Sequence, residues 1–329
     1  MVSTFKRKAE NLSSAGFTCS DRHSSTTGVF KRLPMSLALR HYRKQIALDE
    51  PFSAEKILSE ADFNAALAEL TGFLADEEGG ILPSPDWPGI ADLRAMLTRR
   101  GPEPLPVKYL RLSDALLQTL KSRRVITKAL ELPAIADTLK TSSYPEAGVC
   151  KLWLGDITGL EVDGIVNAAN EKMLGCFIPF HACIDNAIHW QAGPRLRADC
   201  ETIMQAQHLS DEETGSAKIT RGYNLPARYV LHTVGPVVRG PLTAEHHEQL
   251  SSCYQSCLHL ASQAGLRSLA FCAISTGVYG FPHRPAARTA LETVARWLSE
   301  HPGRFDHIIF NVFSADHERI YQECLEAYQ

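Results

Sequence analysis

Apolar positions divide the chain into two parts with different periodicities. Between residues 35 and 141 the apolar side chains recur mostly at helical spacing. This pattern predicts a small all-α domain with helices over residues 36–47, 54–78, 90–100, 114–124 and 135–140. Ser53 and Ser113 are the expected N-caps of the second and fourth helices. One apolar stripe of the second helix is expected to contain Leu58, Phe63, Leu67, Leu70 and Leu74.

From residue 142 onward, short apolar strands alternate with helices. The predicted strands cover residues 149–157, 164–169, 218–225, 229–235, 268–274 and 307–313. The predicted helices cover residues 184–193, 246–265, 285–300 and 316–329. This alternation indicates an α/β domain with a mixed, largely parallel sheet between two helical layers. Ligands of such sheets bind at the carboxyl ends of the strands, so we expect the functional side chains there.

Composition places the chain among soluble globular proteins. Its 329 residues suffice for two domains, and 44% of them are hydrophobic and 22% charged. The net charge of −3 gives no reason to expect nucleic acid or a membrane surface as a partner, and no apolar run approaches the roughly 20 residues of a membrane span. Nine cysteines, an odd number, suit a reducing compartment, so we expect a cytoplasmic protein.

The first 34 residues form a basic leader. Residues 1–44 contain nine Lys and Arg against two acidic residues, a net charge of +7, and are rich in Ser and Thr. We interpret residues 1–34 as a flexible tail. The alternative is an organellar transit peptide, which has a similar composition. The predicted organisation is therefore a leader (1–34), a helical domain (35–141) and an α/β domain (142–329). The helical domain is either a platform for the α/β domain or a partner-binding surface.

Three polar segments follow predicted strands of the α/β domain. A carboxylate such as that of Asp156, in GDIT, can accept a hydrogen bond from an exocyclic amine such as that of adenine. The carboxamide of Asn170, in NAAN, can donate to and accept from ribose hydroxyls. In STGVYGFP, Gly277 and Gly280 allow backbone N–H groups to close around a diphosphate.

Taken in order, the segments GDIT, VDGIVNAAN, TGSAKITRGYNLPARYVLHTVGP and AISTGVYGFP resemble the macrodomain family over residues 149–329. The resemblance implies a three-layer α/β/α macrodomain with a mixed central sheet and a cleft for ADP-ribose. It implies that Asp156 and Ile157 meet the adenine and that Asn170 meets the distal ribose. Phe313 stands where family members place an aromatic ring against the adenine, although core packing is the alternative. The residues expected around the diphosphate and distal ribose are Ser275, Thr276, Gly277, Val278, Tyr279, Gly280 and Phe281.

The loop after Asn170 contains two thiols and an imidazole within eight residues. Cys176, His181 and Cys183 have the spacing Cys-x4-His-x-Cys, and these are the ligand types that Zn²⁺ prefers. Three local ligands leave one coordination position open, which is typical of catalytic rather than structural zinc. The alternative is buried free thiols, which is what we expect of Cys200, Cys253, Cys257 and Cys272.

This loop resembles that of the zinc-dependent branch of macrodomains, which are ADP-ribosyl hydrolases. The resemblance also implies a helical segment before the macrodomain and, for some members, an association with sirtuin-like ADP-ribosyltransferases. Asp185 lies in a segment resembling the one where hydrolytic macrodomains place a catalytic aspartate at the start of a helix. The alternative for Asp185 is a helix cap. His189 and His232 are expected to be structural.

The resulting hypothesis is a zinc-dependent mono-ADP-ribosyl hydrolase that acts on modified protein side chains. Asp185 would orient or deprotonate the attacking water, and Asn170 would position the distal ribose. Zinc would act as a Lewis acid on the scissile linkage or on a water, and the sequence does not distinguish the two. The alternatives are a non-catalytic module that binds ADP-ribosylated protein and an O-acetyl-ADP-ribose deacetylase.

Overall fold

The computed structural model describes residues 37–77, 79, 89–208 and 210–328. The predicted basic leader, residues 1–34, lies outside this range. Within it, no helix is both long enough and apolar enough to cross a lipid bilayer.

The centre of the structure is a six-stranded mixed sheet with the order β2-β8-β7-β4-β6-β5. Five strands run parallel, and the edge strand β5 runs antiparallel to β6. Each strand coincides with a predicted segment apart from its ends. The strands are β2 (Cys150–Leu154), β4 (Gly164–Ala169), β5 (Ala217–Arg221), β6 (Tyr229–Val234), β7 (Ser268–Phe271) and β8 (His307–Val312).

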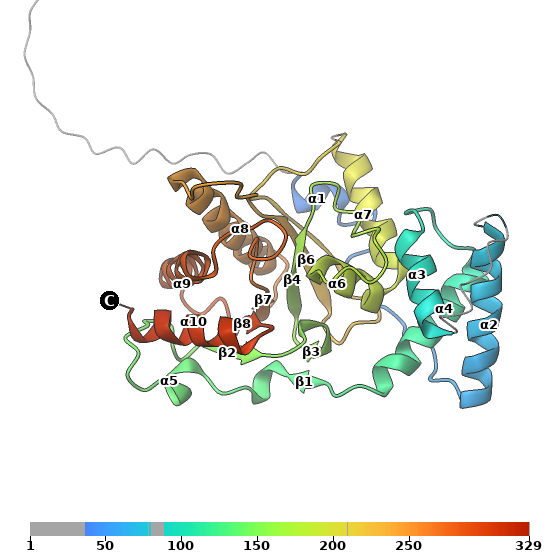
Figure 1. The fold of residues 1–329 in the computed structure, drawn as a ribbon, viewed down its shortest axis with the longest axis horizontal. Helices are drawn as coiled ribbons and strands as arrows, with labels where there is room; N and C mark the ends of the chain where they lie inside the picture. Colours follow the sequence, from blue (N-terminus) through green and yellow to red (C-terminus); the bar gives the residue numbers. More distant parts are fainter. Residues whose placement is uncertain (1–36, 78, 80–88, 209, 329) are drawn as a thin grey trace, which may run out of the picture. The chain divides into compact units, whose positions relative to one another are not determined.

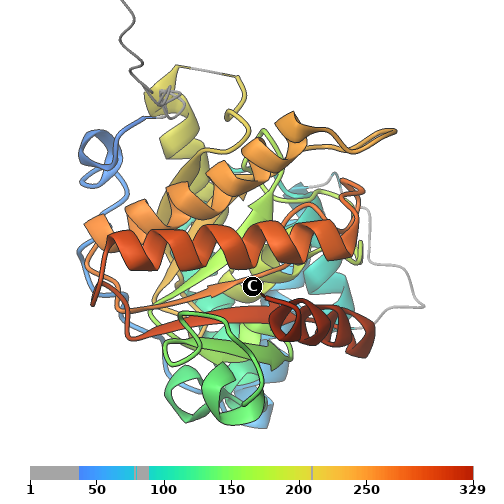
Figure 2. The same ribbon diagram turned by 90° about the vertical axis from the view of Figure 1, so that its left-hand side faces the viewer.

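Helices cover both faces of the sheet, which confirms the predicted three-layer α/β/α arrangement (Figures 1 and 2). One face carries α6 (Ile184–Ala192) and α7 (Pro194–Gln207). The other carries α8 (Ala244–Gln263), α9 (His283–Glu300) and α10 (Ala315–Glu326). The sequence prediction did not include α7, although Pro194 at its first turn is a typical helix-start signal.

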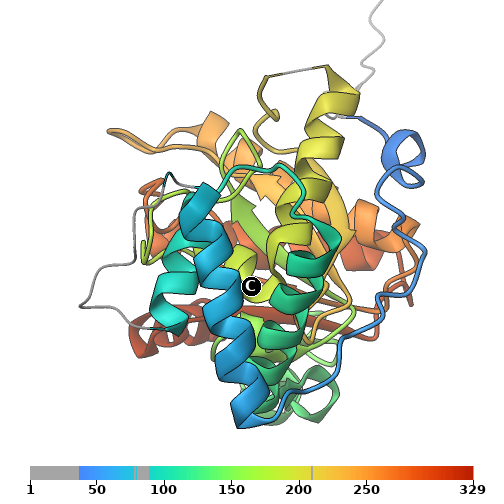
Figure 3. The ribbon, with the colours of Figure 1, turned by 90° about the vertical axis from the view of Figure 1, so that its right-hand side faces the viewer.

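Most of the helices that precede the sheet pack together on the outer side of α6 and α7, as Figure 3 shows for α2, α3 and α4. The predicted stripe is confirmed, because Phe63, Leu67, Leu70 and Leu74 are buried and Leu58 packs against them. Trp190 of α6 belongs to the same apolar cluster. The elements of this region are α1 (Leu39–Tyr42), α2 (Glu60–Glu77), α3 (Ile90–Arg99), α4 (Val107–Ser122), β1 (Thr127–Lys128), a 3-10 turn (Ala129–Glu131) and α5 (Ile135–Thr138).

Both predicted N-caps of this region are wrong. The helix α2 begins at Glu60, after Ser59, whose hydroxyl oxygen accepts a hydrogen bond from the Asp62 backbone N–H at 3.2 Å. The backbone N–H of Leu58 donates instead to the Thr119 hydroxyl at 3.0 Å, so the preceding segment is tied to α4 and does not extend the helix. Ser113 is buried inside α4, which begins six residues earlier, after Pro106.

Residues before position 142 contribute to two separate cores. Those of α2, α3 and α4 form the outer cluster, whereas Leu39, Tyr42 and Ile135 belong to the main core around the sheet. The Tyr42 hydroxyl accepts a hydrogen bond from the Ile219 backbone N–H on the edge strand β5 at 3.1 Å. The predicted boundary at residue 142 stays a prediction, because the packing joins segments on both sides of it.

A buried polar network also ties α4 to the α/β part of the chain. Asn224 donates from Nδ2 to Asp114 Oδ1 at 2.9 Å, and Gln118 Nε2 donates to Asn224 Oδ1 at 2.8 Å. Downstream of α4, β1 pairs in parallel with β3 (Leu160–Glu161), next to a second 3-10 turn, η2 (Ile157–Gly159). The helical region is therefore connected to the sheet at several points.

Candidate active site at the carboxyl ends of the strands

Asp156 follows β2 and caps η2. Its Oδ1 accepts hydrogen bonds from Thr158, from the backbone N–H at 2.9 Å and from the hydroxyl at 2.7 Å. Its Oδ2 accepts from Arg124 Nη2 at 2.9 Å. The side chain is still 53% exposed, so an anchored carboxylate faces solvent at this end of the sheet.

Phe313 stands beside Asp156 at the same edge. It follows β8, and the Gly155 backbone N–H donates to the carbonyl of Val312 at 3.0 Å, which holds the two strand ends together. Its side chain is 79% exposed, so the alternative of core packing is wrong. Ile157, in contrast, is only 1% exposed and packs in the main core, so its side chain does not reach the solvent as those of Asp156 and Phe313 do.

The segment from Ser275 to Phe281 forms an open loop after β7. Its ends are anchored, because the Phe281 backbone N–H donates to the Ser275 carbonyl at 2.9 Å and the Phe281 ring is buried against His247. Its middle is open: Val278 is exposed, and no heavy atom of the described residues lies within 4 Å of a Cβ placed on Gly277. This arrangement suits a loop whose backbone closes around a ligand.

Ser275 carries the clearest sign of strain in this loop. Its φ of +63° lies in the left-handed region, which non-glycine residues rarely adopt. Its hydroxyl oxygen is buried and has no hydrogen-bond partner among the described residues. Backbone strain of this kind clusters at functional sites, which is consistent with the predicted role of the loop. The Thr276 hydroxyl is turned back and donates to the Ala273 carbonyl at 2.9 Å.

Tyr279 links this loop to the far end of the site. Burial raises the pKa of its hydroxyl to about 12, with the carboxylates of Glu171 and Asp185 adding to the effect. Its carbonyl accepts a hydrogen bond from the Val238 backbone N–H at 2.8 Å. The Tyr279 hydroxyl of the predicted diphosphate loop therefore lies near Glu171, the first residue of the loop after Asn170.

The three predicted metal ligands converge in that second loop. The Cys176 and Cys183 sulfurs and a ring nitrogen of His181 all lie within 4.8 Å of one another, and Cys176 Sγ is 3.5 Å from His181 Nδ1. Ligand atoms around one tetrahedral zinc ion are roughly 3.3–3.8 Å apart, given bonds of about 2.0–2.3 Å. Burial raises the pKa of the Cys183 thiol to about 12, and a bound divalent cation reverses this effect by stabilising the thiolate. The chemistry and proximity of these donors fit a zinc ion.

Asp185 lies in the first turn of α6, two residues after Cys183, which ends the loop of the predicted metal ligands (residues 171–183, the metal-ligand loop). The N-cap of α6 is Cys183, whose sulfur accepts from the Asn186 backbone N–H at 3.4 Å, so the alternative of Asp185 as the cap is wrong. Asp185 is 5% exposed, and its Oδ1 accepts a hydrogen bond from Asn167 Nδ2 at 2.8 Å. Burial raises the pKa of Asp185 to about 6, although the bond from Asn167 and the charge of Arg197 oppose this.

Asn170 organises the loop from its first residue. Its Nδ2 donates to the Gly175 carbonyl at 3.1 Å and, at 3.4 Å, to Asp185 Oδ2. Gly175 has a φ of +84°, and a Cβ there would come within 2.8 Å of the His189 ring, so only glycine fits. In this structure the amide of Asn170 therefore shapes the loop, and its contact with a ribose stays a prediction.

A polar chain inside the core positions Asp185, and the sequence analysis did not identify it. Asn167 Nδ2 lies 3.2 Å from His232 Nδ1, and His232 Nε2 lies 3.0 Å from the Thr220 hydroxyl. Burial lowers the pKa of His232 to about 3, so the ring is neutral, in agreement with the structural role expected for it. His189 Nε2 lies 3.5 Å from Asp185 Oδ1, and burial keeps the His189 pKa well below its usual value, so this contact is not an ion pair.

The remaining thiols behave as core residues. Cys200, Cys253, Cys257 and Cys272 are all buried, as predicted. Cys200 forms a second convergent group with His189 and His232. Because both ring nitrogens of His232 already contact Asn167 and Thr220, we interpret this group as part of the core network rather than as a metal site.

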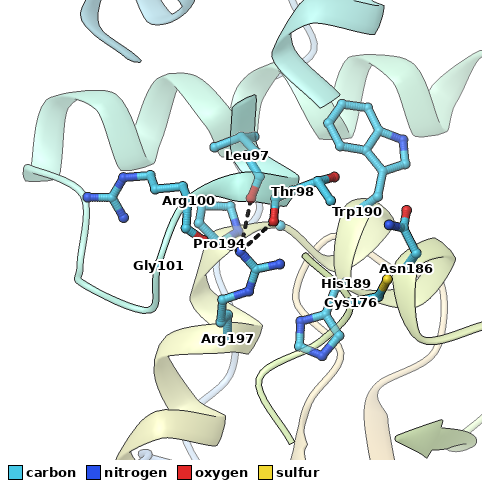
Figure 4. Close-up of a pocket in the computed structure, with 11 residues that line it drawn as sticks. Leu97, Thr98, Arg100, Gly101, Cys176, Asn186, His189, Trp190, Pro194 and Arg197 are labelled. Atoms are coloured by element: carbon cyan, nitrogen blue, oxygen red, sulfur yellow. Dashed lines mark hydrogen bonds between the residues drawn. The ribbon is translucent and has the colours of Figure 1, made fainter. Parts of the chain in front are cut away.

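The helical region braces the metal-ligand loop from outside. Arg197 of α7 donates to the carbonyls of Leu97 and Thr98 at 3.0 and 3.3 Å, as Figure 4 shows, and its guanidinium carbon lies 4.5 Å from the centre of the Phe177 ring. Arg94 of α3 donates to Asn186 Oδ1 at 3.3 Å. A small cavity lies between these elements and is lined by Leu97, Thr98, Arg100, Cys176, Asn186 and Arg197.

Comparison with known proteins identifies this architecture. The model of the Macro domain family matches residues 166–290. A protein-ADP-ribose hydrolase from Treponema medium is 44% identical over 233 residues, which cover 71% of this chain and 86% of the relative. The chain belongs to the macrodomain family. A protein-ADP-ribose hydrolase from Staphylococcus aureus (strain MRSA252) is 42% identical to this macrodomain, with 72% of the chain and 82% of the relative covered.

Solved macrodomain structures agree with this assignment. The Trypanosoma brucei macrodomain in complex with ADP-ribose is 34% identical to the chain, with a TM-score of 0.54. The match covers 70% of this chain and 94% of the trypanosomal chain. The trypanosomal structure therefore matches more of the chain than the family model does, since that model matches only residues 166–290.

Proposed function

We propose that this macrodomain is a hydrolase that removes ADP-ribose from modified protein side chains and depends on a zinc ion held by Cys176, His181 and Cys183. The observation that carries the proposal is the position of Asp185: a buried carboxylate with a pKa of about 6 lies directly behind a convergent group of two thiols and an imidazole. The names of the bacterial relatives and the ADP-ribose in the trypanosomal structure support the same substrate.

Nucleotide binding would use the exposed groups along the strand ends. Asp156 accepts a hydrogen bond from the adenine amine, and the exposed ring of Phe313 stacks on the base. The open loop around Gly277 directs its backbone N–H groups at the diphosphate. Asn170 contacts the distal ribose at the end of the site that lies opposite Asp156. These contacts hold the distal C1″ next to Asp185, and such positioning alone lowers the barrier substantially.

The reaction itself would be a hydrolysis assisted by Asp185. The oxygen of a water forms a bond to C1″ while the bond from C1″ to the protein side chain breaks. The proton of that water passes to Asp185 Oδ2, which accepts only the longer bond from Asn170 at 3.4 Å whereas Oδ1 accepts from Asn167 at 2.8 Å, and then to the leaving side chain. A pKa near 6 lets the carboxylate accept a proton close to neutral pH, a contribution of about 10²–10⁴ in rate. When bound, zinc supplies Lewis-acid stabilisation of negative charge at the scissile end.

The partners and location follow from the same proposal. The substrates are mono-ADP-ribosylated proteins, and the resemblance to the zinc-dependent branch favours a sirtuin-like ADP-ribosyltransferase as the enzyme that modifies them. The eight cysteines of the described residues are free thiols, which is typical of a reducing compartment and favours the cytoplasm.

The proposal is tested by coupling metal analysis to a single-turnover assay on a mono-ADP-ribosylated protein. The purified chain should contain about one zinc ion, and Cys183→Ala should lose most of it and release ADP-ribose at least about 100-fold more slowly. Cys324→Ala, which removes a thiol in α10 remote from the loop, serves as the control and should change neither value.

Two results would contradict this. If Cys183→Ala releases ADP-ribose at the parent rate, zinc is not catalytic. If the parent chain binds ADP-ribose but releases none from the modified protein, the macrodomain is a binding module.

A further inference from the structure

Arg124 lies outside every segment that resembles the macrodomain family, yet it touches the adenine end of the proposed site. It follows α4 by two residues. Its Nη2 donates to Asp156 Oδ2 and to the Thr158 hydroxyl, both at 2.9 Å, and its Nη1 lies 3.4 Å from the Thr158 carbonyl. The helical region thus delivers a guanidinium to the carboxylate that we assign to the base.

These contacts close a ring of hydrogen bonds. The Thr158 hydroxyl donates to Asp156 Oδ1, and its oxygen accepts from Arg124 Nη2. Arg124 Nη2 also donates to Asp156 Oδ2, which completes the ring. The carboxylate is thus held at both oxygens, by Thr158 at Oδ1 and by the charge-assisted bond from Arg124 at Oδ2, and this fixes its plane. Asp156 therefore cannot rotate freely, even though half of its side chain faces solvent.

The ring also leaves a defined acceptor for a ligand. Oδ1 already accepts two hydrogen bonds from Thr158, whereas Oδ2 accepts one from Arg124, and a carboxylate oxygen has two lone pairs. Oδ2 therefore keeps one free acceptor position on a side chain that is 53% exposed, at the strand ends that also carry the exposed Phe313. An oxygen that only accepts matches a base that carries an amino group there and opposes a base that carries a carbonyl oxygen.

We propose that Arg124 is a specificity-determining residue of this macrodomain, because its guanidinium fixes Asp156 in the orientation that selects a 6-aminopurine over a 6-oxopurine. The inference rests on the proposed binding of ADP-ribose with its adenine at Asp156. Arg124 acts through Asp156 and is a positioning residue. Its removal lets the carboxylate turn and bind water, so the discrimination between the two bases falls while the diphosphate and ribose contacts remain.

The test compares the affinities of the full-length chain for ADP-ribose and for its inosine analogue, which has a 6-oxo group, by calorimetry. The parent should prefer ADP-ribose by at least about tenfold, the effect of one charge-assisted hydrogen bond. Arg124→Ala should weaken ADP-ribose binding by about tenfold and change the affinity for the inosine analogue by less than about threefold. Arg124→Lys should retain part of the preference, because an ammonium reaches Asp156 without the planar fork.

Arg123→Ala is the matched control. The adjacent guanidinium donates to Glu60 at 2.7 Å and lies 4.6 Å from the Phe63 ring centre, within the helical cluster, so its loss should leave the preference unchanged. An unchanged preference in Arg124→Ala, or a parallel loss of both affinities, would overturn the role of Arg124 alone. Failure of the parent chain to bind ADP-ribose would overturn the proposed function, and this inference with it.

Discussion

The two ends of the proposed cleft each present a carboxylate, but in opposite environments. Asp156 is half exposed and pairs with the guanidinium of Arg124, whereas Asp185 is buried and bonded to the neutral amide of Asn167. Burial raises the pKa of Asp185 to about 6, which suits proton transfer near neutral pH. An exposed carboxylate fixed by an arginine suits recognition of a hydrogen-bond donor. We therefore assign affinity and base selectivity to one end and turnover to the other.

The helical region supports both ends through arginines. Arg124 reaches Asp156, and Arg94 reaches Asn186, whose Nδ2 in turn donates to the Ile178 carbonyl of the metal-ligand loop at 2.9 Å. The region thus contributes directly to the site rather than serving only as a platform. Substitutions at Asp185, Gly277 and Phe313 test whether the two ends differ in function.

The largest effect is expected at the distal end. Asp185→Asn removes the proton acceptor but nearly keeps the shape, so the maximal rate of ADP-ribose release should fall by about 10²–10⁴, with the affinity for ADP-ribose within about threefold of the parent. Single-turnover kinetics and calorimetry measure the two quantities. Asp156→Asn is the counterpart, and it should weaken binding while leaving the maximal rate nearly unchanged. If both variants changed the same quantity, the division of labour would be wrong.

An intermediate effect is expected between the two ends. Gly277→Glu places a negative charge beside the diphosphate and should weaken ADP-ribose binding about 100-fold by calorimetry. Gly277→Ala is the control, because apart from its chain neighbours no heavy atom of the described residues lies within 4 Å of a Cβ at this position. The affinity of this variant for ADP-ribose should stay within about threefold of that of the parent. Equal affinities of the parent and the glutamate variant would mean that the diphosphate lies elsewhere.

The smallest effect is expected at the base. Phe313→Ala removes the stacking surface and should weaken ADP-ribose binding about tenfold, whereas Phe313→Trp should retain it. Because Phe313 is 79% exposed, the free energy of unfolding of the alanine variant, measured in urea, should stay within about 0.5 kcal/mol of that of the parent. A large loss of stability with unchanged affinity would show that the ring is structural after all.

Local patterns predicted the parts of this molecule that depend on neighbours in sequence. Five of the six strands of the sheet are mostly apolar because both faces are covered, the edge strand β5 being the exception, and all six were identified. The predicted metal ligands lie within eight residues, so the short chain between them already limits their separation. The order of segments identified the family, and with it the positions of Asp156 and Asp185.

Contacts between distant segments could not be predicted in this way. Arg124 and Asp156 are 32 residues apart, and Arg197 and Leu97 are 100 apart, and no periodicity encodes such pairs. The chain Thr220–His232–Asn167 that positions Asp185 likewise joins three different strands. The cap expected at Ser53 failed for a related reason, because the bond from Leu58 to Thr119 ties the segment before α2 to α4; the cap expected at Ser113 failed because α4 already begins after Pro106.

The hydrogen bond from Ile219 to the Tyr42 hydroxyl has a consequence for how the chain must be handled. Strand β5 ends the sheet, and an open sheet edge offers unpaired backbone groups to any passing copy of the same chain. The buried tyrosine shields that border with a side chain from far upstream. Clipping the chain just after residue 42 would detach this tyrosine from the five-residue edge strand β5 and leave the Ile219 N–H without its acceptor, so self-association through that edge should accompany loss of the upstream segment.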